Sequence, residues 1–174
     1  MHSVPPAVPL LLVLVASACG ATTRPDGGQG ILPVGSPAPD VEGRDASGAR
    51  VSLASASGRH RVVYFYPKDA TPGCTREACA FRDAWDRYQA RGVQVFGVSR
   101  DSEASHDRFR EEHRLPFPLV ADEDGRAQRA YGVASRLGMS ARVTFVVGPD
   151  GRVERVIEDV DPGVHADEIL ASIR

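Results

Sequence analysis

Short apolar runs separated by polar, charged stretches mark the chain from about residue 58 onward. The run 62–66 lies between Gly58–Arg61 and Pro67 and predicts a strand buried on both faces. Further strands are predicted at 93–99, 117–120, 143–147 and 153–157, the last two joined by the turn Gly148-Pro149-Asp150-Gly151. Helices are predicted after residue 73 through about Ala90, and over 102–113, 123–131 and 165–173. This order predicts an α/β protein whose central mixed β-sheet is flanked by helices.

Composition narrows the classes of protein that fit this pattern. The 174 residues are 42% hydrophobic and 25% charged, which suits one well-buried domain. The net charge is −2, and no run of five or six like charges occurs, so nucleic acid and acidic membrane surfaces are excluded as expected partners. Three cysteines do not make a disulfide scaffold, and each therefore needs its own explanation.

The N-terminus carries the pattern of a targeting signal. Residues 8–15 are almost wholly apolar, and Ala16-Ser17-Ala18 follows as a small-residue cleavage site. We therefore expect a signal peptide over 1–18, too short to span a membrane, and export to the bacterial cell envelope or periplasm. Cys19 stands where the lipobox of bacterial lipoproteins places the lipidated residue, although Ala16 replaces the usual Leu and no Lys or Arg precedes Arg24.

Two other interpretations of this terminus stay open. The first is ordinary cleavage after Ala18 without lipidation, and the second is a wrongly chosen start or an uncleaved tail. With Cys19 lipidated, the only membrane contact would be the lipid anchor. Residues 19–32 are rich in Gly, Thr, Pro, Asp and Gln and predict a flexible tether, which leaves 33–174 as the domain.

The segment around Cys74 holds the candidate chemistry. Thr71 followed by Pro72 is typical of a helix start, which places Cys74 in the first turn. Unpaired N–H groups and the helix dipole favour negative charge there, so the thiol is biased toward the reactive thiolate. The Thr71 hydroxyl is in reach to donate to the thiolate or to an incoming oxygen, and Pro67 would stiffen the rim of the pocket.

Cys79 lies five residues after Cys74. In one helix their Cα atoms would be separated by roughly 8.6 Å, whereas a disulfide tolerates at most about 7 Å. Bonding them would require the first turns to unwind, which favours a redox switch over a static bridge. Spacing alone also allows an inert helix-terminal cysteine and a Thr-Pro pair that only caps.

A family resemblance decides among these alternatives. The signature Pro-x-x-x-Thr-x-x-Cys stands here as Pro67, Thr71 and Cys74 within the segment 64–79. Further matching stretches lie at 35–40, 97–102 and 115–119. Over about residues 34–160 the chain resembles AhpC/TSA-type peroxiredoxins of the bacterioferritin comigratory protein class, also called the peroxiredoxin Q class. The resemblance implies a thioredoxin-like fold.

The resemblance also implies a reaction cycle, in which the chain is a thioredoxin-dependent peroxidase. Cys74 attacks hydrogen peroxide or an organic hydroperoxide and becomes a sulfenic acid, and Cys79 then forms an intramolecular disulfide with it. A thioredoxin-like dithiol donor reduces that disulfide. The family's distant Arg matches Arg142, which would hold the thiolate and the peroxide, while Thr71 and Pro67 keep the roles given above. We expect a monomer that needs no cofactor.

Two rival functions are retained. A thiol-disulfide oxidoreductase or metal chaperone would use the same scaffold, although such proteins usually carry two or three residues between their cysteines and this chain has four. A non-enzymatic envelope module would hold Cys74 and Cys79 in a fixed disulfide. The five His residues show no ligand spacing, so we expect no metal site.

Overall fold

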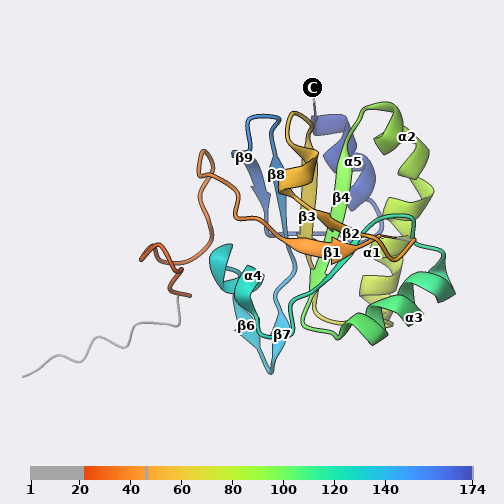
Figure 1. Cartoon of the computed structure of the whole chain (residues 1–174), viewed down its shortest axis with the longest axis horizontal. Helices are drawn as coiled ribbons and strands as arrows, with labels where there is room; N and C mark the ends of the chain where they lie inside the picture. Colours follow the sequence, from red (N-terminus) through yellow and green to blue (C-terminus); the bar gives the residue numbers. More distant parts are fainter. Residues whose placement is uncertain (1–21, 46, 174) are drawn as a thin grey trace, which may run out of the picture.

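A seven-stranded sheet forms the centre of the computed structural model, which describes residues 22–45 and 47–173 (Figure 1). The strand order is β2-β1-β5-β4-β3-β8-β9. The strands are β1 Glu42–Arg44, β2 Arg50–Ser52, β3 Arg61–Phe65, β4 Gln94–Ser99, β5 Leu119–Ala121, β8 Val143–Val147 and β9 Val153–Ile157. β3, β4 and β5 are parallel, whereas β1, β8 and the edge strands β2 and β9 pair antiparallel to their neighbours. The predicted mixed sheet is confirmed.

Helices cover both faces of this sheet (Figure 1). They are α1 Pro72–Asp83, α2 Trp85–Ala90, α3 Glu103–His113, α4 Arg126–Ala130 and α5 His165–Ser172, with a short 3-10 helix η1 at Ala54–Ala56. All five residues of β3 are buried, as predicted, because successive side chains enter opposite cores. Val62 and Tyr64 pack with residues of α1, α2, α3 and α5, whereas Val63 and Phe65 pack with residues of α4. Burial of a large apolar side chain such as Phe81 in the first core contributes about 2–3 kcal/mol.

The helix predicted through Ala90 is interrupted at one residue. Ala84 has ψ −2°, so α1 ends at Asp83 and α2 begins at Trp85. Beyond this break the Tyr88 hydroxyl donates a 2.7 Å hydrogen bond to the carbonyl of Ala166 on α5. The interruption thus fits α2 to the C-terminal helix.

Short strands escaped the sequence analysis because two or three residues show no period. They are β1, β2 and the hairpin strands β6 Ser135–Arg136 and β7 Met139–Ser140. In β1, Gly43 has a packing reason: a Cβ there would lie 2.5 Å from the carbonyl oxygen of Leu119 on β5. Because Gly43 lies between two charged residues, strand β1 shows no apolar pattern in the sequence.

The predicted tether is only partly described, and its described part is structured. Leu32 is buried and its N–H donates to the Tyr131 carbonyl at 2.9 Å. The Arg24 guanidinium donates to the carbonyl of Gly30 at 2.8 Å. The segment therefore joins the domain at the apolar anchor Leu32, whereas the Arg24 contact lies within the segment itself, and the flexible tether stays a prediction.

The signal peptide predicted over 1–18 and the lipidation site Cys19 lie outside the described residues. Within the part that the structure describes, no helix has the length and apolar character needed to cross a bilayer.

Candidate active site

Cys74 is the third residue of α1, in the first turn after the loop that follows β3. Thr71 occupies the N-cap position with extended backbone angles of −82° and 147°, and Pro72 opens the helix, as the sequence predicted. The thiol is 2% exposed. Its place in the first turn puts the sulfur at the positive end of the helix dipole, where the first N–H groups lack partners within the helix.

Arg142 reaches Cys74 from the segment that enters β8. Strand β8 pairs with β3 so that Val143 lies opposite Phe65, which brings residue 142 to the end of β3 where the active-site loop begins. The Arg142 Nη2 donates to the Cys74 Sγ at 3.2 Å. Gly73 lies beside this contact, since a Cβ there would meet the same nitrogen at an ordinary van der Waals distance of 3.4 Å. The structure thus joins two predicted site residues that are 68 positions apart.

Thr71 does not make the contact that its position predicts. No hydrogen bond from its side chain caps α1, and instead its hydroxyl donates to the carbonyl of Lys68 at 3.0 Å. The loop between β3 and α1 folds back here, which brings the Lys68 carbonyl within reach of the hydroxyl as an acceptor. Its predicted donation to the thiolate or to a peroxide would require this bond to open. Pro67 is half-buried in the same loop.

Cys79 lies on another side of α1. It is half-buried and lines a hollow of about 360 Å³ with Arg76, Asp83 and Asp167. Both cysteines are free thiols and both belong to the continuous helix α1. The two cysteines share one helix, as the sequence predicted, so a disulfide between them would require α1 to unwind.

A buried acid behind Cys74 was missed by the sequence analysis. Glu77 is 0% exposed and forms an ion pair with Arg142 through Oε2. Its Oε1 has no hydrogen-bond partner among the described residues and lies 4.0 Å from the Nε2 of His165 on α5. That nitrogen is 2.7 Å from the Thr144 hydroxyl on β8. The signal was available, because Glu77 stands three residues after Cys74 in the buried stripe of α1.

The family comparison agrees with this geometry. The model described as the AhpC/TSA family matches residues 34–156, a range that contains Cys74, Cys79 and Arg142 and more than half of the chain. The chain belongs to the AhpC/TSA family. Its relatives place it in the peroxiredoxin Q class and confirm the thioredoxin-like fold.

Three relatives illustrate the similarity of this AhpC/TSA-family chain to known proteins. It is 41% identical over 139 residues to the chloroplastic peroxiredoxin Q of Oryza sativa subsp. japonica, covering 78% of this chain and 64% of the rice protein. Peroxidoxin BcpB from Mycobacterium tuberculosis superposes with a TM-score of 0.72 at 33% identity, covering 80% of this chain and 95% of that one. The bacterioferritin comigratory protein of Xanthomonas campestris, whose structures address alkyl peroxide reduction, has a TM-score of 0.69 at 35% identity, covering 76% and 88%.

Burial shifts the pKa values of two groups behind Cys74, Glu77 and His165, in opposite directions. Burial raises the pKa of Glu77 from 4.5 to about 7, although the charge and hydrogen bond of Arg142 oppose the rise. Burial, helped by the positive charge of Arg142, lowers the pKa of His165 from 6.5 to about 4. His165 is therefore neutral at neutral pH, while Glu77 titrates there. In this chain, Arg142 is therefore paired with a carboxyl group, that of Glu77, whose charge changes near pH 7.

Replacing Glu77 by glutamine is expected to change the pH dependence of folding stability. A pKa raised in the folded state means that the folded protein keeps a proton that the unfolded chain releases, so this group's contribution falls as pH rises from 4.5 to about 7. The stability of Glu77→Gln relative to wild type should therefore increase by about 3 kcal/mol across that window. Urea unfolding at several pH values measures the difference.

The comparison with wild type is needed because His165 contributes with the opposite sign. Its lowered pKa makes the protein gain stability as pH rises from about 4 to 6.5, which masks the Glu77 contribution in wild type alone. Glu111→Gln, an exposed change on α3, is the matched control and should show no such increase. A constant difference between wild type and Glu77→Gln at all pH values would contradict the assignment.

Proposed function

We propose that the chain is a thiol peroxidase that reduces hydrogen peroxide and organic hydroperoxides. The observation that carries this proposal is the guanidinium of Arg142, 3.2 Å from the Cys74 sulfur at the start of a helix, in a member of the AhpC/TSA family. Organic hydroperoxides are included because a relative of the same class, from Xanthomonas campestris, is described through its alkyl peroxide reduction.

The proposed first step uses the groups that meet at Cys74. The thiolate attacks the terminal peroxide oxygen, the O–O bond breaks, and the leaving oxygen departs as water or an alcohol after taking up a proton. Cys74 is then a sulfenic acid. Arg142 serves this step twice, because its always-charged planar group holds the thiolate and stabilises the negative charge that develops on the leaving oxygen.

The proposed second step needs movement of α1. When its first turns unwind, the Cys79 thiol gives up its proton and attacks the Cys74 sulfur, the sulfenic oxygen leaves as water with that proton, and an intramolecular disulfide forms. A thioredoxin-like dithiol then reduces this disulfide through a mixed disulfide. Both cysteines come from one chain, so we propose that a monomer completes the cycle. The partly exposed position of Cys79 on the hollow beside α5 supports its access by a donor.

One equivalent of peroxide tests the cycle. Wild type is expected to lose both thiols and two hydrogen atoms of mass, and to regain them with a dithiol donor. The variant Cys79→Ser should still consume the peroxide but stop at a sulfenic acid, which dimedone traps on Cys74. If the Cys74–Cys79 disulfide forms without peroxide, and the reduced protein reduces a disulfide substrate, the chain is a thiol-disulfide oxidoreductase and the proposed cycle is wrong.

We also propose that the chain is exported to the bacterial cell envelope and anchored by a lipid on Cys19. The support is the apolar stretch 8–15 followed by Ala16-Ser17-Ala18-Cys19. An envelope thioredoxin-like protein would then be the donor, since a cytosolic one would not reach it. The mass of the mature N-terminus tests this, because cleavage after Ala18 without acylation, or an intact Met1, would overturn the lipid anchor.

A further inference from the structure

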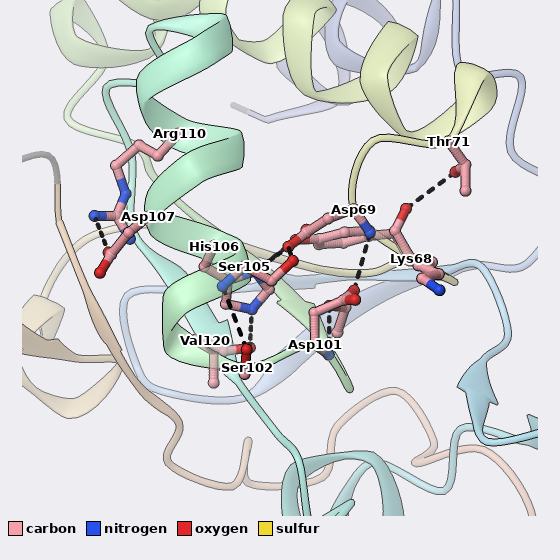
Figure 2. Close-up of polar contacts among 12 residues, drawn as sticks. Lys68, Asp69, Thr71, Asp101, Ser102, Ser105, His106, Asp107, Arg110 and Val120 are labelled. Carbon is pink, nitrogen blue, oxygen red and sulfur yellow. Dashed lines mark hydrogen bonds and ion pairs between the residues drawn. The ribbon is translucent and has the colours of Figure 1, made fainter.

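The loop between β3 and α1 is anchored by a buried carboxylate (Figure 2). Asp69 is 6% exposed and accepts hydrogen bonds from the Tyr66 hydroxyl at 2.7 Å and from the Ser105 hydroxyl at 2.8 Å. Its Oδ2 lies 2.9 Å from the Nδ1 of His106 on α3. Its backbone N–H donates to Asp101 at 2.9 Å. Asp69 therefore fastens the active-site loop to α3 and to the segment after β4 at once.

His106 faces hydrogen-bond acceptors on both sides. The ring is 1% exposed, and its Nε2 lies 3.1 Å from the carbonyl oxygen of Val120 on β5. A carbonyl and a carboxylate are both acceptors, so both ring nitrogens are placed to donate, and His106 forms an ion pair with Asp69 when the ring carries both protons. Burial would raise the pKa of Asp69, but the hydrogen bond and charge of His106, with the Tyr66 and Ser105 hydroxyls, lower it overall. The anchor is a buried ion pair.

The anchored loop has an unfavourable backbone conformation. Ala70, the residue after Asp69, has φ 55°, in the left-handed region that non-glycine residues rarely occupy. Thr71 follows immediately as the N-cap residue of α1. Such a conformation persists only where surrounding contacts hold it, and the contacts on either side of Ala70 are those of Asp69 and the Thr71 hydroxyl bond to the Lys68 carbonyl.

We propose that Asp69 and His106 are positioning residues that hold the first turn of α1 closed, so that Cys74 faces Arg142, and that thereby restrain its opening toward Cys79. The inference rests on the proposed function. Unwinding α1 to bring Cys74 to Cys79 displaces Thr71 and the strained Ala70, and the Asp69 anchor lies directly before them in the chain. With the anchor weakened, the closed site is less populated and the open one more populated.

Two substitutions test the anchor with one matched control. Asp69→Asn and His106→Asn each remove one charge of the pair while keeping a polar side chain of similar reach. Asp107→Asn removes an exposed partner of Arg110 on the same helix, 3.2 Å away, without touching the loop. Stopped-flow fluorescence of Trp85, the single tryptophan, separates Cys74 oxidation from disulfide formation after one equivalent of hydrogen peroxide.

The two rate constants are expected to move in opposite directions. Both anchor variants should slow Cys74 oxidation about tenfold, because reacting groups are misplaced, and should speed disulfide formation several-fold. Excess peroxide should then produce less sulfinic acid, since the sulfenic acid has less time to be oxidised again. Asp107→Asn should change neither constant by more than about twofold.

The fall in the rate constant of Cys74 oxidation at acidic pH, its acid limb, gives a second test of the anchor. The groups that face Asp69 and His106 are Tyr66 at the end of β3, Ser105 on α3, the Val120 carbonyl on β5 and, through the backbone, Asp101. A lowered pKa means that the anchor is present above the usual carboxyl range and is lost as pH falls through the folded pKa. His106→Asn removes the main cause of that lowering, so its acid limb should shift to higher pH.

The outcomes separate this inference from the proposed function. Unchanged rate constants in both variants, or two constants that fall together in folded protein, would overturn the positioning role while leaving the peroxidase intact. A wild type that forms no Cys74–Cys79 disulfide would instead overturn the proposed function. If both charge variants fail to fold, Ser105→Ala is used instead, because it removes only one hydrogen bond to Asp69. It should slow Cys74 oxidation and speed disulfide formation by smaller factors. Unchanged rate constants in Ser105→Ala would also contradict the positioning role.

Discussion

Replacing Cys74 by serine is expected to reduce peroxide consumption to the uncatalysed background, a loss of at least about a thousandfold. The physical reason is the nucleophile itself. Sulfur attacks peroxide oxygen as a thiolate, a far better nucleophile than the hydroxyl that serine would place beside Arg142. Consumption of hydrogen peroxide in the presence of a dithiol donor measures the loss.

The control for this variant is Cys79→Ser, which removes the other described thiol from the same helix. It should still reduce one equivalent of peroxide at the wild-type rate, because Cys79 acts only after the sulfenic acid has formed. Since serine is nearly the size of cysteine, the buried site around residue 74 should keep its fold, which circular dichroism checks. Full turnover by Cys74→Ser would exclude Cys74 as the nucleophile and with it the proposed cycle.

The second large effect is expected at Arg142. Arg142→Met should lower the second-order rate constant of Cys74 oxidation by about 10²- to 10³-fold, the usual loss when one donor to a developing negative charge is removed. The methionine keeps most of the packing volume but cannot donate to the Cys74 sulfur or pair with Glu77. Glu77 would then be a buried carboxyl without its cation, so it should take up a proton, and the fold should lose some stability.

Two further variants identify the origin of that loss. Arg142→Lys keeps the positive charge, but a compact ammonium group cannot contact Glu77 and Cys74 together, so an intermediate rate is expected. Arg136→Met removes an exposed arginine from the neighbouring strand β6 and should leave the rate unchanged. A rate for Arg142→Met within a few-fold of wild type would show that the guanidinium is not part of the chemistry.

Local patterns sufficed for the reactive segment. The Thr71-Pro72 helix start predicted that Cys74 lies in the first turn of α1, and it does. The helix predicted from residue 73 to about Ala90 includes both cysteines, and they do share α1. The buried strand β3 and the hairpin of β8 and β9 also followed from short-range pattern, because strand alternation and turn chemistry act over only a few residues.

Contacts between distant segments were out of reach of local pattern. Arg142 was matched through family resemblance, but only the pairing of β8 with β3 carries it to Cys74. Glu77 reads as an ordinary helix charge until α5 and β8 close over it, and residues 22–32 read as a polar tail until Leu32 enters the core. The interruption at Ala84 likewise accompanies a distant contact, because Tyr88 beyond it bonds to Ala166 on α5.

The sequence by itself therefore determined the order of the main elements, the place of Cys74 at a helix start and the shared helix of the two cysteines, because these depend on neighbours in the chain. The tertiary structure alone decided what surrounds the thiol: the Arg142–Glu77 pair, the neutral His165 behind it and the Asp69–His106 anchor of its loop. Each of these joins groups from different elements. Their charges and burial exist only after the sheet and helices have packed.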